Sequence, residues 1–440
     1  MILMKGELRM IKKLSLFLLT LCFVAGCSND AEQSEETVVY PFQEVTQLIG
    51  FEVTTKNNDQ YRIESNGEEW VSEDVDQLDP SAISTFLDKV VSLQAKVADA
   101  ADVVVKEKTL LQLALYPSED EKLELSLYHD SEGNFYGKMT GTTDWLYFPN
   151  LPMELEEFSN SYLQAAIDLK VGVLEAIQFE DPSQSFEINQ ESDFSKVESA
   201  PFISGWFLHG IYETPFSVEY QTMDVILERL ENFRGEETEE AIPSETEMFF
   251  TLTLRGSDGQ ETLVFGEPDE ESVLVHLEEA NKSYRIPLLL ARTFQLTAFD
   301  ITDNFISIIP LDSLRQVELK TAENTLLIEA NHEVTTNDED EVGVSSTFFL
   351  NSDQLDETAF RKNYQYLAAL KYVNPYDGSE PISDEVSLTI TYHFQSEGET
   401  LVHTIRFYDL NEEEYLVEKN GIREFTAKKE QVQEMLTVFK

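Results

Sequence analysis

Basic residues are scarce in this chain of 440 residues, which has 31 lysines and arginines against 84 aspartates and glutamates and a formal net charge of −53. Neutralising a phosphate backbone requires clustered lysine and arginine, so this composition excludes a nucleic-acid-binding protein. The same charge disfavours direct adsorption to anionic lipid headgroups. Hydrophobic residues still make up 42% of the chain and aromatic residues 11%, which is enough for ordinary hydrophobic cores.

Cysteine is almost absent, because the chain has two, Cys22 and Cys27, and both lie among the first thirty residues. A disulfide framework is therefore excluded from the remainder of the chain. Also absent are a glycine-rich phosphate loop, a His-Glu-x-x-His helix and a Gly-x-Ser-x-Gly elbow. We expect a protein that is not an enzyme, with no catalytic residues and no cofactor.

The six histidines are scattered along the sequence at His129, His209, His276, His332, His393 and His403. His393 and His403 flank one predicted hairpin and could face each other across it. Two histidines lack the third protein ligand that zinc normally takes. We therefore expect no metal site, and interpret the histidines as solvent-facing or hydrogen-bonded.

The N-terminus carries the strongest signal. Lys12 and Lys13 precede an apolar run, residues 14–25, whose length suits the hydrophobic region of a secretory signal. The run ends in Val24-Ala25-Gly26-Cys27, which resembles the lipobox of bacterial lipoproteins. The resemblance implies a signal peptide over residues 1–26, cleavage between Gly26 and Cys27, and a diacylglyceryl anchor on Cys27. The alternative is an ordinary cleaved signal with an incidental cysteine, and either Met1 or Met10 can be the start.

Residues 27–39 follow as the lipidated cysteine and an acidic tether. Ser28 to Val38 are polar and acidic and show no periodicity, which is typical of a flexible linker. Two acyl chains give stable anchoring where one chain gives only marginal binding. We expect a protein held by lipid on the extracytoplasmic side of the cell membrane, with the bilayer as its first partner.

Three copies of one unit fill the rest of the chain. The first sign is a helix whose apolar residues follow the spacing of one buried face. This face consists of Ile83, Phe86, Leu87, Val90 and Leu93, then Met223, Ile226, Leu227, Leu230 and Phe233, then Phe360, Tyr364, Leu367 and Leu370. The segments predict helices from Leu78 to Val97 and from Tyr220 to Phe233. Asp79 is expected to cap the first helix ahead of Pro80.

The second sign is a two-strand element ahead of each helix. Each one reads as two alternating apolar pairs around a turn: Phe51/Val53 with Tyr61/Ile63, Ile177/Phe179 with Phe186/Ile188, and Val317/Leu319 with Leu326/Ile328. An aromatic follows each hairpin, at Trp70, Trp206 and Phe349. Alternating strands then begin near Leu111, Phe249 and Leu388, and last strands centre on Tyr147, Tyr284 and Phe425.

A period near 140 residues is too long for a solenoid repeat and indicates tandem domain duplication. We predict an α+β chain with repeat units at 40–166, 167–305 and 306–440. Each unit should be an antiparallel sheet, made of a hairpin and a meander, packed with one longer and one short helix.

Acidic clusters and tryptophans are the remaining candidate features. The densest acidic runs are Glu236–Glu240, Glu267–Glu271 and Asn337–Glu341, and none has the register of an EF-hand loop. We interpret them as solvated loops, with weak cation binding as the alternative. Trp70 and Trp206 suggest a carbohydrate platform, but their recurrence before a buried helix favours core packing. The segment from Trp145 to Pro149 is expected to be a final strand.

The order of elements resembles the domain-of-unknown-function family catalogued as four-three-four-zero, found in bacterial lipoproteins and membrane-anchored proteins. The residues that carry the resemblance are Gly67 to Trp70 and Ser204 to Trp206 running into the helices, with Ile167 to Leu169 and Asp312 to Leu314 before the next hairpins. The third copy departs from it with Phe349 in place of tryptophan. The resemblance implies an accessory or docking subunit of an ABC-type transporter. The alternative is a free-standing envelope lipoprotein that binds cations, basic peptides or wall components.

Overall fold

The computed structural model describes residues 38–439 except 76, 102, 106–107, 192–203, 241–247, 337–341, 379–384 and 397. The predicted signal peptide, Gly26, Cys27, most of the tether and the acidic run Asn337–Glu341 lie outside the described residues. Contacts divide the chain into two compact units, one of residues up to Gln60 with Asp88–Leu151, the other of Tyr61–Leu87 with Pro152–Lys440. The predicted repeat boundaries stay a prediction. Over the described ranges, every helix is too short or too polar to cross a membrane.

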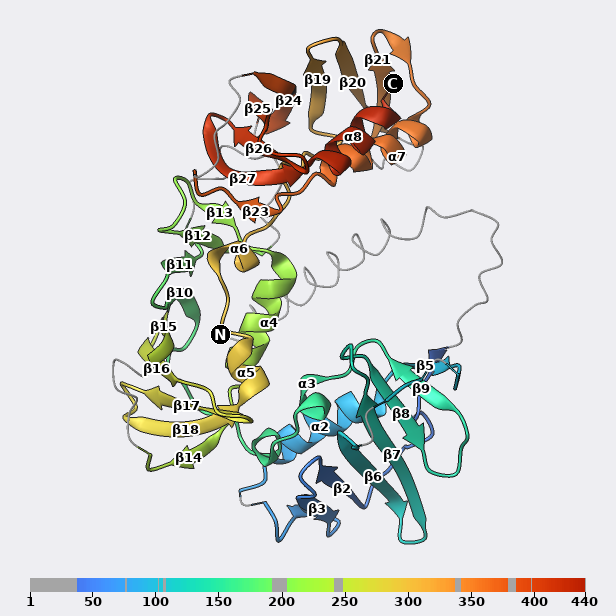
Figure 1. Cartoon of the computed structure of the whole chain (residues 1–440), viewed down its shortest axis with the longest axis vertical. Coiled ribbons are helices and arrows are strands. Elements are labelled where there is room, and N and C mark those ends of the chain that lie inside the picture. The colour runs from blue at the N-terminus through green and yellow to red at the C-terminus, as the bar shows by residue number, and fades with distance from the viewer. Residues whose placement is uncertain are drawn as a thin grey trace. The chain divides into compact units, whose positions relative to one another are not determined.

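Three antiparallel sheets of nine strands each make up most of the structure (Figure 1). Sheet 1 has the spatial order β1-β5-β9-β8-β7-β6-β2-β3-β4. Its strands are β1 (Val38–Val39), β2 (Gly50–Thr55), β3 (Gln60–Ser65), β4 (Trp70–Val71), β5 (Ala95–Ala98), β6 (Leu111–Ser118), β7 (Glu121–His129), β8 (Phe135–Met139) and β9 (Trp145–Phe148). The helices of this repeat are α2 (Pro80–Val91), α3 (Met153–Glu156) and the 3-10 helix η1 (Asn160–Leu163).

Sheet 2 has the order β13-β12-β11-β10-β15-β16-β17-β18-β14. Its strands are β10 (Leu174–Glu180), β11 (Ser185–Asn189), β12 (Phe207–His209), β13 (Phe216–Ser217), β14 (Glu236–Thr238), β15 (Met248–Gly256), β16 (Gly259–Gly266), β17 (Ser272–Leu277) and β18 (Lys282–Pro287). The helices are α4 (Tyr220–Glu231), α5 (Leu288–Arg292) and α6 (Ala298–Ile301).

Sheet 3 has the order β22-β21-β20-β19-β24-β25-β26-β27-β23. Its strands are β19 (Leu314–Thr321), β20 (Thr325–Thr336), β21 (Val342–Leu350), β22 (Asp353–Gln354), β23 (Asn374–Pro375), β24 (Val386–Ser396), β25 (Glu399–Asp409), β26 (Glu414–Lys419) and β27 (Ile422–Lys428). The helices are α7 (Glu357–Ala368) and α8 (Lys429–Val438), which lie side by side (Figure 1).

One strand order recurs in all three sheets. The run β5-β9-β8-β7-β6-β2-β3-β4 corresponds to β14-β18-β17-β16-β15-β10-β11-β12 and to β23-β27-β26-β25-β24-β19-β20-β21. Sheets 2 and 3 each continue with one short strand, β13 or β22, whereas sheet 1 instead gains β1 beside β5. The shared order confirms the predicted fold class of three similar α+β units, each built on an antiparallel sheet.

Each long helix begins at a carboxylate in the same place of its repeat. Asp79 Oδ1 accepts the N–H of Ala82 at 2.7 Å, and Asp356 Oδ1 accepts that of Ala359 at 2.8 Å. Glu219 does the same for Thr222 at 2.6 Å. A negative side chain that accepts from the free N–H groups of a first turn also suits the positive end of the helix dipole. The predicted cap at Asp79 is therefore confirmed.

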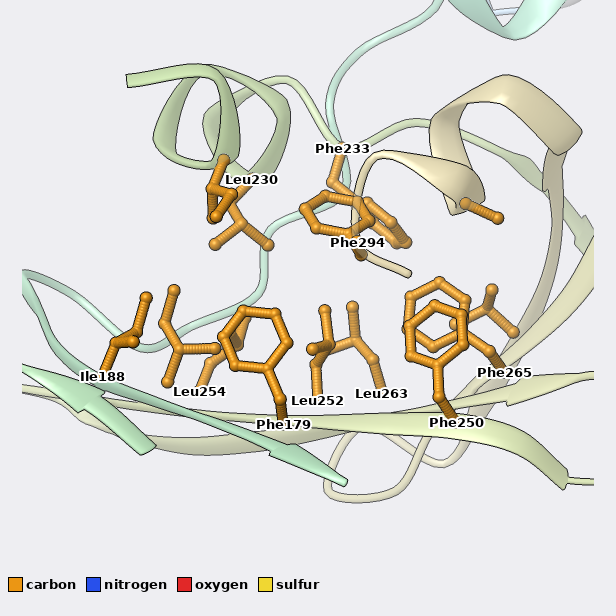
Figure 2. Close-up of a cluster of buried hydrophobic side chains, with 14 of the residues drawn as sticks. Phe179, Ile188, Leu230, Phe233, Phe250, Leu252, Leu254, Leu263, Phe265 and Phe294 are labelled. Atoms are coloured by element: carbon orange, nitrogen blue, oxygen red, sulfur yellow. The ribbon is translucent and has the colours of Figure 1, made fainter. Parts of the chain in front are cut away.

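The predicted apolar face of the long helices is buried in sheet 2's repeat, where Figure 2 shows the packing. Leu230 and Phe233 from α4 and the residues after it, together with Phe294, lie over the side chains that rise from the sheet. Those sheet side chains include Phe179, Ile188, Phe250, Leu252, Leu254, Leu263 and Phe265. The hairpin register Ile177 to Ile188 and Phe179 to Phe186 puts both predicted apolar pairs on this face.

The predicted helix from Leu78 to Val97 is too long. The helix α2 ends at Val91, and Ala95–Ala98 form β5, which pairs with β9 and β1. In the sequence alone, the apolar residues Ala95 and Val97 read as one more turn of the helix. In the structure Ala95 is buried and Val97 is exposed, as in a strand. The corresponding helices α4 and α7 are likewise followed by a short edge strand, β14 or β23.

The aromatic of the third repeat is one residue earlier than predicted. Phe207 pairs with Asn189, and Phe349 pairs with Glu329 at the corresponding place, so Phe348 rather than Phe349 matches Trp206. Trp206 and Phe348 are both buried, whereas Phe349 is only partly buried. Phe348 and Phe349 are adjacent in the strand and therefore point to opposite faces of the sheet. Only the strand register shows which of the two is buried. Trp70 is only partly buried, so the expected core packing holds for Trp206 and in part for Trp70.

Two joints connect consecutive repeats through the same backbone hydrogen bonds. The first joint consists of residues 163–167 with 78–79 and 233–234. The second consists of residues 301–306 with 217–219 and 370–372. Asp79 N donates to Leu163 O at 2.9 Å, and Glu219 N donates to Ile301 O at 2.8 Å. The linking segment is thus fastened to the start of the long helix of its own repeat.

The other half of each joint fastens the linking segment to the next repeat. Ile167 N donates to Phe233 O at 2.7 Å, and Ile306 N donates to Leu370 O at 2.9 Å. Both acceptors are the residues that complete the buried face of the next long helix. Isolated bridges from Leu78 to Gln164 and from Val218 to Thr302 flank these bonds. The joint therefore repeats with the same residue spacing as the repeats themselves.

We predict that Phe348→Ala lowers the free energy of unfolding by about 3–5 kcal/mol, since it empties a fully buried site. The Phe348 ring stacks on Phe360 with centroids 4.2 Å apart. Phe349→Ala is the matched control and should cost much less, because its side chain is only partly buried. Urea unfolding of both variants measures the difference, and equal losses would contradict the register described above.

Candidate functional site

A polar groove lies on sheet 2, on the face opposite to the core. Its volume is about 850 Å³, and it is lined by Glu175, Ala176, Glu187, Asn189, Gln190, Glu191, Arg255, Gly256, Gly259 and Gln260. Neighbouring residues Ile177, Ile188 and Leu254 belong to the core, so the alternation of the strands places Ala176, Asn189 and Arg255 on the other face. The lining carries three carboxylates and one guanidinium, so its formal charge is negative.

Two irregularities of the backbone hollow out this groove. The register of β10 against β15 shifts between Leu174 and Ala176, which leaves Glu175 as an extra residue with an exposed side chain. At Gly256 a Cβ atom would lie 2.3 Å from Val171 O and 2.5 Å from Val173 O. Only glycine fits so close an approach of two backbone segments. The turn after β15 is therefore pinned to residues 171–173.

The polar side chains of the groove fall into two groups. One group is hydrogen-bonded and forms its floor, and the other is exposed and forms its rim. Arg255 is ion-paired with Glu187, whose other oxygen accepts from Asn189 Nδ2 at 2.7 Å. Glu175 and Glu191 lie at the rim with exposed side chains. Exposed carboxylates beside a hollow suit a ligand that carries positive charge, while the Arg255–Glu187 pair keeps the floor neutral.

The predicted acidic runs of repeat 2 are drawn together by one arginine. Arg285 Nε and one of its terminal nitrogens both donate to the Glu240 carboxylate at 2.6 Å, and its other terminal nitrogen lies 2.6 Å from Asp269 Oδ2. Hydrogen bonds from Arg285 hold the pKa of Glu240 below its usual value. Asp269 also accepts the N–H groups of Glu271 and Ser272. The prediction of a solvated loop is wrong for Glu236–Glu240, because Glu236–Thr238 form β14 and pair with β18. Glu267–Glu271 hold an ion pair and a turn.

The histidines do not gather. His393 pairs with Val402 and His403 with Tyr392, so the two histidines point to opposite faces of sheet 3, and the prediction that they could face each other is wrong. His276 lies 3.1 Å from Ser283 Oγ, and His332 lies 2.8 Å from Ser346 Oγ. His209 contacts Glu191 O, and His129 ends β7. Over the part of the chain that the structure describes, no three metal-binding side chains come together.

A nearly buried ion pair lies beside the first joint, and nothing in the sequence pointed to it. Arg229 of α4 lies 3.1 Å from Glu154 of α3, with side chains 16% and 10% exposed. Arg234 Nε donates to Gln164 O at 2.9 Å. Burial and the nearby carboxylates of Glu154 and Glu157 raise the pKa of Tyr162. This cluster places polar contacts between side chains and backbone of the first and second repeats beside the joint.

The second joint is aromatic instead. The ring of Phe425 lies 4.9 Å from that of Tyr212, 5.1 Å from that of Phe216 and 4.6 Å from that of Tyr372, measured between centroids. Phe299 also contacts it at 5.7 Å. The contacts with Tyr212 and Phe216 are edge-to-face, a geometry that stabilises beyond the area that it buries. The two joints therefore share their backbone bonds but differ in the side chains that surround them.

Comparison with known proteins gives no relative: no protein-family model, no curated protein and no solved structure matches the chain. The resemblance to the domain-of-unknown-function family consequently stays a prediction from the residues. The groove, the ion pair at the first joint and the perturbed carboxylates were all missed by sequence reasoning. Only the bulge at Glu175 and the glycines near residue 256 could have signalled the groove.

We predict that Arg229→Met destabilises the protein by about 3–5 kcal/mol, because it leaves the Glu154 carboxylate buried without its guanidinium. Arg62→Met is the control, since the Arg62–Glu64 pair is more than half exposed and should contribute less than about 1 kcal/mol. Chemical denaturation at pH 7 measures both. A loss at Arg229 no larger than that at Arg62 would show that the pair at the joint is solvated.

Proposed function

We propose that this protein is a lipid-anchored lipoprotein on the extracytoplasmic side of the cell membrane, and that it acts without catalysis as an accessory or docking subunit of an ABC-type transporter. The lipobox sequence from Val24 to Cys27 supports the anchor. The transporter association rests on the family resemblance. Signal peptide, cleavage before Cys27 and lipidation belong to the same proposal.

The single observation that carries the non-catalytic role is the repeated joint. Two consecutive linking segments use the same pairs of backbone hydrogen bonds, with lengths of 2.7–2.9 Å, to fasten one repeat to the next. Bonds of this kind fix a linker that would otherwise be free to bend. Within the compact unit that contains both joints, Tyr61–Leu87 with Pro152–Lys440, each linking segment is held to fixed partners. That property suits a scaffold that docks on a partner.

We expect the native lipoprotein, purified from its own host in mild detergent, to recover a permease and its ATPase near stoichiometry. Cys27→Ala is the control, because loss of the anchor should remove both membrane association and these partners. Mass spectrometry of the recovered proteins gives the measurement. Recovery of the lipoprotein alone, at the same yield from both forms, would overturn the docking role.

The groove favours the second candidate function, a free-standing lipoprotein that binds basic peptides. Glu175 and Glu191, both exposed, line this groove of about 850 Å³. The corresponding positions of the other sheets lack this arrangement, because Arg255 is matched by Tyr116 in sheet 1 and by His393 in sheet 3. Charge complementarity of this kind steers a cationic ligand to one place on an acidic protein.

For this second function, a fluorescein-labelled oligolysine peptide should bind the protein in a salt-dependent manner. Glu175→Gln/Glu191→Gln should weaken binding about three- to tenfold, as expected for two exposed charge pairs. Glu119→Gln/Glu121→Gln removes the same charge at the corresponding turn of sheet 1 and is the matched control. Fluorescence anisotropy measures the affinities. Equal weakening by both double variants would mean that the peptide responds to the overall charge and not to the groove.

A further inference from the structure

Two carboxylates meet at the end of the sheet 2 core. Glu261 lies on β16 two residues before Leu263, so alternation turns its side chain toward the core, and it is 3% exposed. Glu279 lies in the turn between β17 and β18, next to Ala280, which packs against the same core. Glu279 is exposed, whereas the buried Glu261 carboxylate loses most of its hydration, which makes its charged form costly.

One backbone N–H group donates hydrogen bonds to both carboxylates. Thr262 N donates to Glu261 Oε1 at 3.2 Å and to Glu279 Oε2 at 2.7 Å. Glu261 also accepts the N–H groups of Glu279 at 3.0 Å and of Ala280 at 3.1 Å. The two carboxyl groups therefore tie the β17–β18 turn to β16. Two carboxylates that converge on one donor repel each other when both are charged.

Burial, together with the hydrogen bond to Glu279, raises the pKa of Glu261 to about 7. Burial also opposes the charge of Glu279, but hydrogen bonds from Glu261 and from backbone N–H groups hold the pKa of Glu279 below its usual value. The pair thus holds one proton, on Glu261, below neutral pH. Since the folded-state pKa is the higher one, this contribution to stability is complete below about pH 4.5 and is lost as the pH rises through about 7.

The charged and titratable neighbours come from β14, β17 and β18. Tyr284 of β18 is buried, and Lys282 is paired with Glu237 of β14 at 2.7 Å. His276 of β17 alternates with the core residues Val275 and Leu277 and bonds Ser283. It therefore faces away from Glu261.

The third repeat shows that the fold does not require carboxylates at this corner. Strand register matches Thr262 with Thr404, whose N–H donates to Asn420 Oδ1 at 3.0 Å, and matches Glu261 with the buried His403. The backbone pairing of the turn is also shared, from Glu278 N to Thr262 O and from Asn420 N to Thr404 O. In the third repeat a neutral amide at the position of Glu278 accepts the strand N–H of Thr404, in a turn of residues 420–421 where repeat 2 has residues 278–281. The corresponding residue in sheet 1 is Leu123.

We propose that Glu261 and Glu279 form a proton-operated latch that holds the β17–β18 turn, Glu278–Asn281, against β16. With one proton on the pair, the two side chains share the Thr262 N–H and bond each other. Release of that proton to solvent charges both groups, and their repulsion loosens the turn and withdraws Ala280 from the core. The latch would let a protein outside the membrane respond to pH near neutrality, and it does not depend on the proposed docking role.

Hydrogen exchange on the full-length lipoprotein in detergent micelles tests the latch, with rates corrected for intrinsic pH dependence. We expect protection of the segments around Thr262 and Glu279–Ala280 to fall at least fivefold between pH 5.5 and pH 8.0. The corresponding segments of sheet 1 around Glu124 and Thr140, where Leu123 stands in place of Glu261, serve as the control within the same chain and should not change. An equal change in both repeats, or none in either, would overturn the proposal.

Three variants separate the latch from other titrations. Glu261→Gln keeps a neutral group that can hydrogen-bond, so protection should stay high at both pH values. Glu279→Asn removes the second charge and leaves a neutral side chain beside the Thr262 N–H, so it should have the same effect if Glu261→Gln fails to fold. Histidines change charge in this pH range, so His276→Asn must retain the pH dependence. Persistence of the fivefold change in Glu261→Gln or Glu279→Asn, or its loss in His276→Asn, would contradict the latch.

Discussion

The backbone hydrogen bonds of the two joints, all within the unit Tyr61–Leu87 with Pro152–Lys440, are the constraint on which the course of the linking segments depends. A linking segment that runs between packed elements must find partners for its N–H and C=O groups, or the burial becomes costly. Here the segment bonds first to the residues ahead of its own long helix, as Leu163 does with Asp79, and then to the end of the next one, as Ile167 does with Phe233. The second joint repeats both steps. Because the long helix takes part at both of its ends, its cap and its buried face serve the joint as well as the core.

Most of the fold could be predicted from apolar spacing, because the helix faces and hairpin pairs are local patterns. The predictions that were wrong depend on how segments distant in the sequence pair with each other. Phe348 and Phe349 differ only in which side of β21 they occupy, and β5 imitates the last turn of a helix until its partner strands are known. The candidate site was even harder to predict from the sequence than the strand pairing. The groove depends on a bulge at Glu175 and on an approach of Val171 O to Gly256, neither of which leaves a periodic signal.

Scarcity of cations shapes how this acidic chain is held together. Arg285 joins two carboxylates, Glu240 and Asp269, whereas the buried Glu418 is bound by two arginines, Arg406 and Arg423. Isolated exposed pairs contribute little to stability, whereas a planar guanidinium that bonds two groups fixes their geometry. The excess carboxylates remain on the surface. Several of the basic side chains are held in ion pairs, and the surface potential is negative. Electrostatic attraction for a cationic partner is therefore strongest at sites such as the groove rim, where carboxylates are exposed.

The three repeats differ where their sheets end, and this difference bears on function. One position at the end of the core is Leu123 in sheet 1, Glu261 in sheet 2 and His403 in sheet 3, although the core residues beside it stay apolar. The place of Arg255 changes in a similar way to Tyr116 and His393. Side chains in a packed interior are restricted by volume, while those at a sheet end can change chemistry without repacking the core. The repeats thus share one scaffold and one joint, and repeat 2 carries at its sheet ends both the groove and the buried carboxylate pair. That concentration makes repeat 2 the unit in which binding and its control would be combined.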